Sequence, residues 1–167
     1  MVLYDYVKPP IDLLYFTNPH RPLLGIQNTF RDLVHCFSEH DVKHYPGLLL
    51  LKLHYSKLRE EFERVSPTLK KTWYHDTNPW FEKNDGYYFY KADQFPLLKS
   101  LINQIQCIHT EGASFAVIEG PMVLHPHRAE SNELLRYQLA IHGDGDCSLY
   151  TENGRYIHRE GEDILFD

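Results

Sequence analysis

The sequence predicts an α+β fold in which a helical N-terminal half packs on a C-terminal set of antiparallel strands. Two observations predict it. Apolar residues in the first half recur every three or four positions, the period of a helix, whereas from Ala113 onward they recur at every second position, the period of a strand. At 167 residues the chain has room for one domain with a sizeable core. We therefore expect a single domain, 1–167, that is mainly helical over 1–112 and stranded over 113–167.

Three helices are expected before the strands begin. Their ranges are 28–40, 48–65 and 95–107. Pro46 and Gly47 precede the second helix, and Ser66 and Pro67 end it. Asp93 is expected to cap the third helix. The aromatic stretch 72–90 contains turn signals and is expected to form a loop that leads into a short strand.

Period-two segments fill the C-terminal part. The expected strands are 114–119, 124–127, 134–142, 147–152, 155–158 and 163–166. The Asn153-Gly154 pair predicts a hairpin turn between the fourth and the fifth. Short antiparallel strands of this kind are typical of a jelly-roll or a barrel, for which about eight strands are expected.

The strand expected at 134–142 carries the candidate functional residues. Its alternation places Arg136 and Gln138 on one face, and Pro126 stiffens the chain before His127. One interpretation is a metal ligand close to a carboxylate-binding arginine. The other is a histidine in a surface turn and an arginine paired with a neighbouring acid. The residues alone leave both open.

A second group of histidines carries less information. His35, His40 and His44 are spaced so that a helix could bring two imidazoles together, but no acidic or sulfur ligand accompanies them. A solvated polar face is the favoured interpretation over a metal site.

Charge and cysteine content exclude several functional classes. The formal net charge is −6 and no Lys/Arg cluster occurs, which argues against nucleic acid or an anionic membrane as the main partner. Peptides, proteins and small molecules remain as partners. The three cysteines lack a C-x-x-C pair, so neither a disulfide framework nor a zinc ribbon is indicated, and a reducing, cytoplasmic location is favoured. The longest apolar run, 48–51, is far short of the roughly twenty residues that span a bilayer.

Two blocks of residues carry a family resemblance. The first consists of Phe115, Glu119, Gly120, Pro121, Pro126 and His127. The second consists of Asn132, Leu135, Arg136 and Leu139, followed by Gly161, Ile164, Leu165, Phe166 and Asp167. In their order and spacing, residues 114–167 resemble the aspartyl/asparaginyl β-hydroxylase family.

The resemblance implies an iron(II)- and 2-oxoglutarate-dependent dioxygenase on a double-stranded β-helix, a jelly-roll, that hydroxylates an Asp- or Asn-type side chain in a peptide or protein. It implies His127 as a metal ligand and Arg136 as the contact to the far carboxylate of 2-oxoglutarate. Gln138 occupies the position of a family histidine that also touches the cosubstrate. Ala129 stands where most enzymes of this chemistry carry an acidic ligand, which this family lacks too.

Three departures from the family pattern concern the cosubstrate pocket. Gln138 replaces the histidine, Ala116 stands where a serine is common, and His158 stands where a tryptophan is usual. The alternative to an oxygenase is therefore a catalytically inactive jelly-roll that serves as a binding module. The family also places a second metal histidine and a further cosubstrate arginine beyond Asp167. We accordingly expect the 167 residues to lack the last strands of the fold and to be inactive alone.

Overall fold

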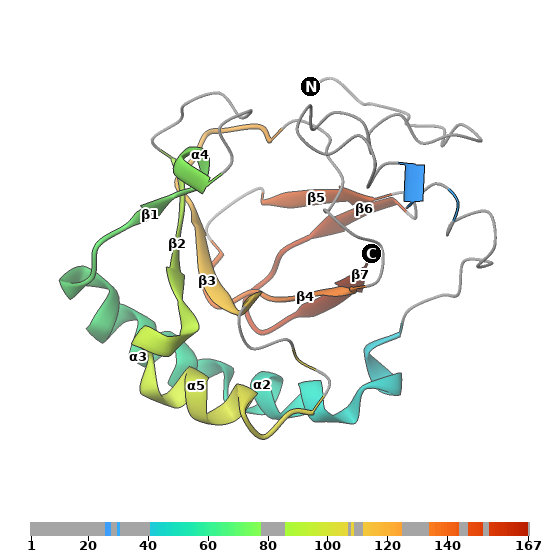
Figure 1. Cartoon of the computed structure of the whole chain (residues 1–167), viewed down its shortest axis with the longest axis horizontal. Helices are drawn as coiled ribbons and strands as arrows, with labels where there is room; N and C mark the ends of the chain where they lie inside the picture. Colours follow the sequence, from blue (N-terminus) through green and yellow to red (C-terminus); the bar gives the residue numbers. More distant parts are fainter. Residues whose placement is uncertain are drawn as a thin grey trace.

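The computed structural model of the protein describes residues 26–27, 30, 41–77, 86–106, 108, 112–124, 134–143, 147–151 and 154–166. Helices α2 (Leu49–Leu53), α3 (Tyr55–Val65) and α5 (Pro96–Ile102) gather on one side of the molecule, below the strands in Figure 1. A short helix, α4 (Tyr74–Thr77), lies apart from them beside β1 (Figure 1). The expected mixture of helices and strands is confirmed.

The strands form three small antiparallel sheets. One is three-stranded, in the order β1 (Thr72–Trp73), β2 (Tyr87–Lys91), β3 (Ser114–Ile118). The second pairs β4 (Arg136–Leu139) with β7 (Asp163–Phe166), and the third is the hairpin of β5 (Ser148–Thr151) and β6 (Gly154–Ile157). β2 supplies the short strand expected at the end of the aromatic stretch. The loop expected before it is wrong at the start of the stretch, where β1 and α4 form.

A jelly-roll is not confirmed by these sheets. In the described ranges the strands form no closed barrel, because they pair only within three separate sheets. The strand expected at 124–127 falls almost entirely outside the described residues, and Leu124 itself is not in a strand. The hairpin β5–β6 lies farther from the helices than the β4–β7 pair does (Figure 1).

A single core joins the helices to two of the sheets. Phe95 and Leu58 are its most buried large side chains, at 0% and 1% exposure. The Phe95 and Phe115 rings lie 4.6 Å apart between centroids in an edge-to-face arrangement. Tyr137 and Leu139 of β4 also pack against this cluster. Both sheets therefore turn one face toward α2, α3 and α5. We call the opposite face, which points away from these three helices, the helix-distant face.

The helix expected over 48–65 is divided in two at His54. The His54 Nδ1 atom lies 2.9 Å from the carbonyl oxygen of Leu50, and the His54 amide donates to the Leu51 carbonyl at 3.1 Å instead. In an unbroken α-helix the Leu50 carbonyl would accept a hydrogen bond from the amide of His54. Here the His54 side chain lies at that carbonyl instead. The apolar stripe still continues across the break, because Leu51 and Leu58 are both buried.

The third expected helix is shorter than predicted and has a different cap. It runs only from Pro96 to Ile102, and Asp93 lies in a 3₁₀ turn before it. The amides of Leu97 and Leu98 donate to the two carboxylate oxygens of Glu61, at 2.7 and 3.1 Å. The cap is therefore supplied from α3 by a buried carboxylate at the positive end of the helix, and the prediction of Asp93 was wrong.

Some predictions lie outside the described residues. The helix expected at 28–40 is one of them, apart from residue 30, which is helical. Residues 125–133, which include His127, are another. None of the helices in the described part of the chain is long and apolar enough to cross a membrane.

Candidate functional site

The helix-distant face of the β4–β7 pair carries the candidate arginine and amide. Arg136 is paired with Phe166 and Gln138 with Ile164 across the ladder. Directly opposed residues of an antiparallel pair project to the same side. Because Tyr137 points into the core, these four side chains point away from the helices, as the alternation predicted. Arg136 is exposed and Gln138 is half-buried.

The β2–β3 pair contributes a second face that points away from α2, α3 and α5, and on it Tyr87 stacks against Tyr74 of α4. Phe89 is paired with Ala116, and Tyr87 with Ile118. The intervening residues, Tyr88 among them, are buried in the core. Ala116 is the position at which the family pattern commonly has serine. It and Gln138, two of the three departures from that pattern, both lie on helix-distant faces.

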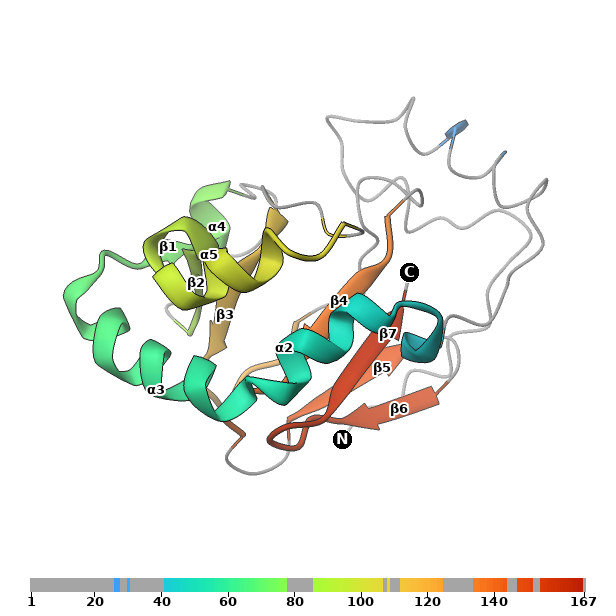
Figure 2. The ribbon, with the colours of Figure 1, turned by 90° about the horizontal axis from the view of Figure 1, so that it is seen from below.

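Tyr87 of the β2–β3 face interacts electrostatically with Arg136 of the β4–β7 face. Burial raises the pKa of the Tyr87 hydroxyl, and the nearby positive charge of Arg136 lowers it in part. In both orientations of the ribbon, β4 lies between β3 and β7 (Figure 1, Figure 2). We call the combined surface the open face, and it consists of Tyr87, Phe89, Ala116, Ile118, Arg136, Gln138, Ile164 and Phe166.

A polar network on the opposite side fixes the strand that carries Arg136. The Tyr137 hydroxyl donates to Asp163 Oδ2 at 3.2 Å, and Lys52 Nζ donates to Asp163 Oδ1 at 2.5 Å. Burial, and then the Asp163 carboxylate, raise the pKa of Tyr137, so its hydroxyl keeps its proton and remains a donor. Helix α2 is thereby tied to both strands of the β4–β7 pair.

A second network fixes the end of β3. Tyr88 Oη donates to Glu119 Oε1 at 2.5 Å, and Lys71 Nζ lies 3.4 Å from the same oxygen. The Tyr88 hydrogen bond lowers the pKa of Glu119. The backbones of Gly86 and Glu119 also lie close together, since the Glu119 amide donates to the Gly86 carbonyl at 2.7 Å. A Cβ on Gly86 would lie 2.5 Å from the backbone oxygen of Glu119. Only glycine fits at position 86.

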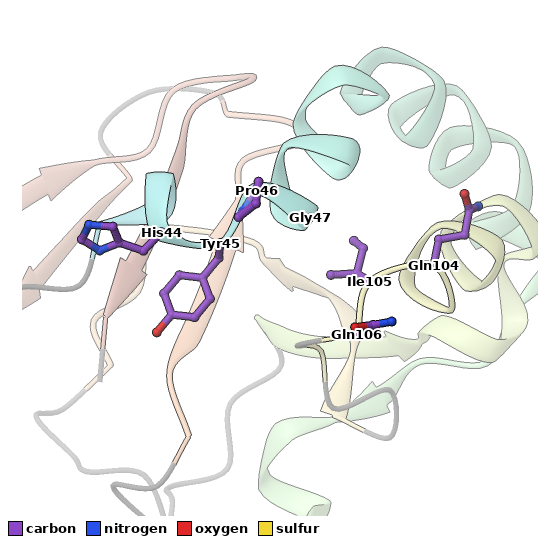
Figure 3. A pocket seen from close by; sticks show the side chains of 7 residues that line it. All are labelled: His44, Tyr45, Pro46, Gly47, Gln104, Ile105 and Gln106. Atoms are coloured by element: carbon purple, nitrogen blue, oxygen red, sulfur yellow. The ribbon is translucent and has the colours of Figure 1, made fainter.

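A separate surface cavity of about 330 Å³ lies on the helical side, between the 3₁₀ turn Pro46–Leu48 and the end of α5 (Figure 3). Its lining residues are His44, Tyr45, Pro46, Gly47, Gln104, Ile105 and Gln106. Gly47 permits the close approach of the turn to the segment that follows α5, since a Cβ there would lie 3.0 Å from Ile105 Cγ2. The cavity contains neither Arg136 nor Gln138.

The assignment of a metal ligand to His127 stays a prediction. His127 lies outside the described residues. Within the described ranges, no group of three or more His, Cys, Asp or Glu side chains is arranged to hold a metal ion. His44 lines the surface cavity, while His35 and His40 lie outside the described residues.

The family pattern of the aspartyl/asparaginyl beta-hydroxylases matches residues 52–167 of the sequence. The chain belongs to this family. The match extends the resemblance seen from residue 114 back through α3, β1 and β2, so the strands on both sides of the open face lie within it. Neither an individual curated protein nor a solved structure matches the chain.

Family membership supports a hydroxylase-type oxidoreductase function. The oxygenase chemistry of the family implies a cofactor, and a hydroxylase of this family suggests a peptide or protein substrate.

Tyr87 is the open-face residue that sequence patterns missed. It lies in the aromatic stretch, where the alternation of residues along β2 shows which side chains share a face of the strand. Nothing in that stretch indicates which other sheet lies next to this face. Its electrostatic interaction with Arg136 links residues of two different sheets. Such an interaction becomes visible only once both sheets are folded onto one core.

Proposed function

We propose that the protein is an iron(II)- and 2-oxoglutarate-dependent hydroxylase of an Asp- or Asn-type side chain in a peptide or protein, built on a partial double-stranded β-helix. The observation that carries the proposal is the presence of Arg136 and Gln138 on the open face of a family member. Arg136 would bind the far carboxylate of 2-oxoglutarate, and Gln138 would donate a hydrogen bond to it.

The open face suits a short dicarboxylic acid. A guanidinium on a strand presents a fixed pair of donors to a carboxylate. The opposed residues Ile164 and Phe166 are apolar and would pack against a hydrocarbon segment. In the described part of the chain, no carboxylate lies within ion-pair distance of Arg136, which favours an external anion over the neighbouring-acid interpretation.

His127 is the proposed metal ligand. β3 ends at Ile118 and β4 begins at Arg136, and both strands contribute to the open face. His127 therefore belongs to the connection between two strands of the site. Imidazole suits iron(II), which when bound supplies the activation of dioxygen. The chain's own part is to hold the cosubstrate carboxylate at Arg136 and the metal at His127.

A second candidate function is a binding module without turnover. Gln138 and Ala116 favour it, because an uncharged amide and a methyl group hold an anion less firmly than an imidazolium and a hydroxyl. The open face would then bind a dicarboxylate or an acidic side chain without oxidising anything.

Succinate formation separates the two functions. The intact native protein is incubated with iron(II), dioxygen and 2-oxoglutarate, with and without peptides that contain Asp or Asn, and succinate is measured. Iron-dependent succinate that rises with an Asp or Asn peptide, but not with the same peptide carrying Ala, supports the hydroxylase. Binding of 2-oxoglutarate without succinate favours the binding module. Absence of binding contradicts both.

A further inference from the structure

Tyr137 lies on β4 between Arg136 and Gln138, the two residues proposed to bind the cosubstrate. Its side chain points to the opposite side of the strand and packs against the core. Its hydroxyl donates to Asp163 Oδ2 of β7 at 3.2 Å. Because Tyr137 points away from the open face, it acts on a ligand there only through its neighbours in the strand.

The acceptor of this hydrogen bond is itself held in place. The Asp163 side chain is 7% exposed, and its other oxygen accepts a hydrogen bond from Lys52 Nζ of α2 at 2.5 Å. Burial, and then the nearby carboxylate, raise the pKa of the Tyr137 hydroxyl, so it stays a donor at neutral pH. The position of β4 is therefore tied through Asp163 to helix α2.

The hydrogen bond joins diagonal neighbours of the β4–β7 ladder. Tyr137 is paired with Leu165, whereas Asp163 is paired with Leu139. The backbone bonds of an antiparallel ladder repeat every two residues, so a shift of β4 along β7 by two residues would keep the same side chains on each face. It would also move Arg136 by about 7 Å along the open face. Such a shift would end the diagonal relation, so the bond favours the observed register.

The length of the ladder makes this side-chain bond important. Each of the two strands has four residues, and Arg136 is the first residue of β4. A ladder this short has few backbone bonds to fix its register. A bond made in one register therefore adds directly to the precision with which the guanidinium is placed.

We propose that Tyr137 is a positioning residue of the cosubstrate site, whose hydrogen bond to Asp163 places Arg136 for contact with the far carboxylate of 2-oxoglutarate. This inference rests on the proposed function. The cosubstrate has a limited span between the oxygens that bind the metal and its far carboxylate. A displaced guanidinium therefore loses contact with that carboxylate.

The first test is a double-mutant cycle on the binding of 2-oxoglutarate to the intact native protein, measured by titration calorimetry with iron(II) and without dioxygen. Tyr137→Phe keeps the ring in the core and removes only the hydroxyl. It should weaken binding by about two- to tenfold, the share of protein that the lost bond releases from the observed register. In the Arg136→Ala background it should have no further effect, because Tyr137 acts through Arg136.

Tyr55→Phe is the matched control, since Tyr55 belongs to α3 and packs on Gly161, and it should bind like the wild type. The same loss of affinity from Tyr137→Phe in both backgrounds would overturn the inference. Wild-type affinity in Tyr137→Phe, together with weaker binding by Arg136→Ala, would overturn the role of Tyr137 and leave the proposed function standing. No binding by the wild type would overturn both.

The second test compares 2-oxoglutarate with 2-oxoadipate, which is longer by one methylene group, under the same conditions. A guanidinium held in one place favours one chain length, so Tyr137→Phe should lower the ratio of the two affinities. A loss of folded protein alone would reduce the binding of both ligands by the same factor and leave the ratio unchanged. An unchanged ratio would therefore overturn the inference.

Discussion

Lys52 Nζ lies 2.5 Å from Asp163 Oδ1, which joins helix α2 to strand β7 across 111 residues of sequence. The Asp163 side chain is 7% exposed and also accepts a hydrogen bond from the Tyr137 hydroxyl. The strand that carries Arg136 is therefore held against the helices by a buried carboxylate. Both of its partners lose their acceptor if that carboxylate is removed.

Asp163→Ala should lower the free energy of unfolding by about 1–3 kcal/mol, because it leaves a buried hydroxyl and a lysine without their acceptor. Urea unfolding followed by circular dichroism measures the change. Glu162→Ala is the control, since Glu162 faces solvent and lies 3.8 Å from Arg159 in an exposed pair. That variant should change stability by less than about 0.5 kcal/mol. Equal effects of the two variants would contradict a structural role for Asp163.

Glu61→Ala should destabilise the protein through the loss of the cap of α5. Two amides of the first turn, those of Leu97 and Leu98, would lose their acceptor, at a cost of about 1–3 kcal/mol. Glu61→Gln retains one acceptor oxygen and should fall between Ala and wild type. Glu60→Ala, at the adjacent exposed position of α3, should be nearly neutral in the same denaturant titration. A neutral Glu61→Ala would mean that the amides are satisfied in another way.

Gly161→Ala should destabilise by about 1–2 kcal/mol, because the backbone φ of +76° at this position is strained for any residue with a Cβ. The added Cβ would also meet the Tyr55 ring at 3.4 Å. Gly112→Ala is the matched control, since a Cβ there meets nothing within 4 Å. Thermal unfolding compares the two, and a melting temperature for Gly161→Ala equal to that of Gly112→Ala would contradict the strain.

His158 should make stability depend on pH below neutrality. Burial lowers its pKa below the ordinary value of 6.5, so the unfolded chain takes up a proton at this residue before the folded chain does. The free energy of unfolding therefore falls as pH falls from 6.5 toward the lower folded pKa. His158→Gln should flatten stability over that window, measured by urea unfolding at several pH values. His142→Gln is the control, because it keeps His158 and should lose stability with falling pH as the wild type does. The same dependence of the free energy of unfolding on pH in the wild type, His158→Gln and His142→Gln would contradict the role of His158.

Local patterns predicted the parts of the molecule that depend on neighbouring residues. The alternation at Arg136 and Gln138 places their side chains on one face because strand geometry repeats every two residues. The hairpin β5–β6 and the strand Asp163–Phe166 were predictable for the same reason. The end of α3 followed from Ser66 and Pro67, which are adjacent to it.

Contacts between distant segments were beyond such patterns. Glu61 and Leu97 are 36 positions apart, so the cap of α5 emerges only when α3 packs beside it. The break at His54 arises because the His54 side chain hydrogen-bonds with the Leu50 carbonyl. The periodicity of apolar residues does not predict such a bond. The electrostatic interaction of Tyr87 with Arg136 likewise requires two sheets to share one core.

The affinity of Arg136→Ala for 2-oxoglutarate, compared with wild type by titration calorimetry, tests the central claim most directly. Loss of the charge-assisted pair should weaken binding by about 1.5–3 kcal/mol, which is at least a tenfold rise in the dissociation constant. Arg155→Ala is the control, because Arg155 is an exposed arginine on β6 that donates to Ser148 Oγ at 3.0 Å. It should bind like wild type. Unchanged affinity in a folded Arg136→Ala protein would contradict the assignment of the open face as the cosubstrate site.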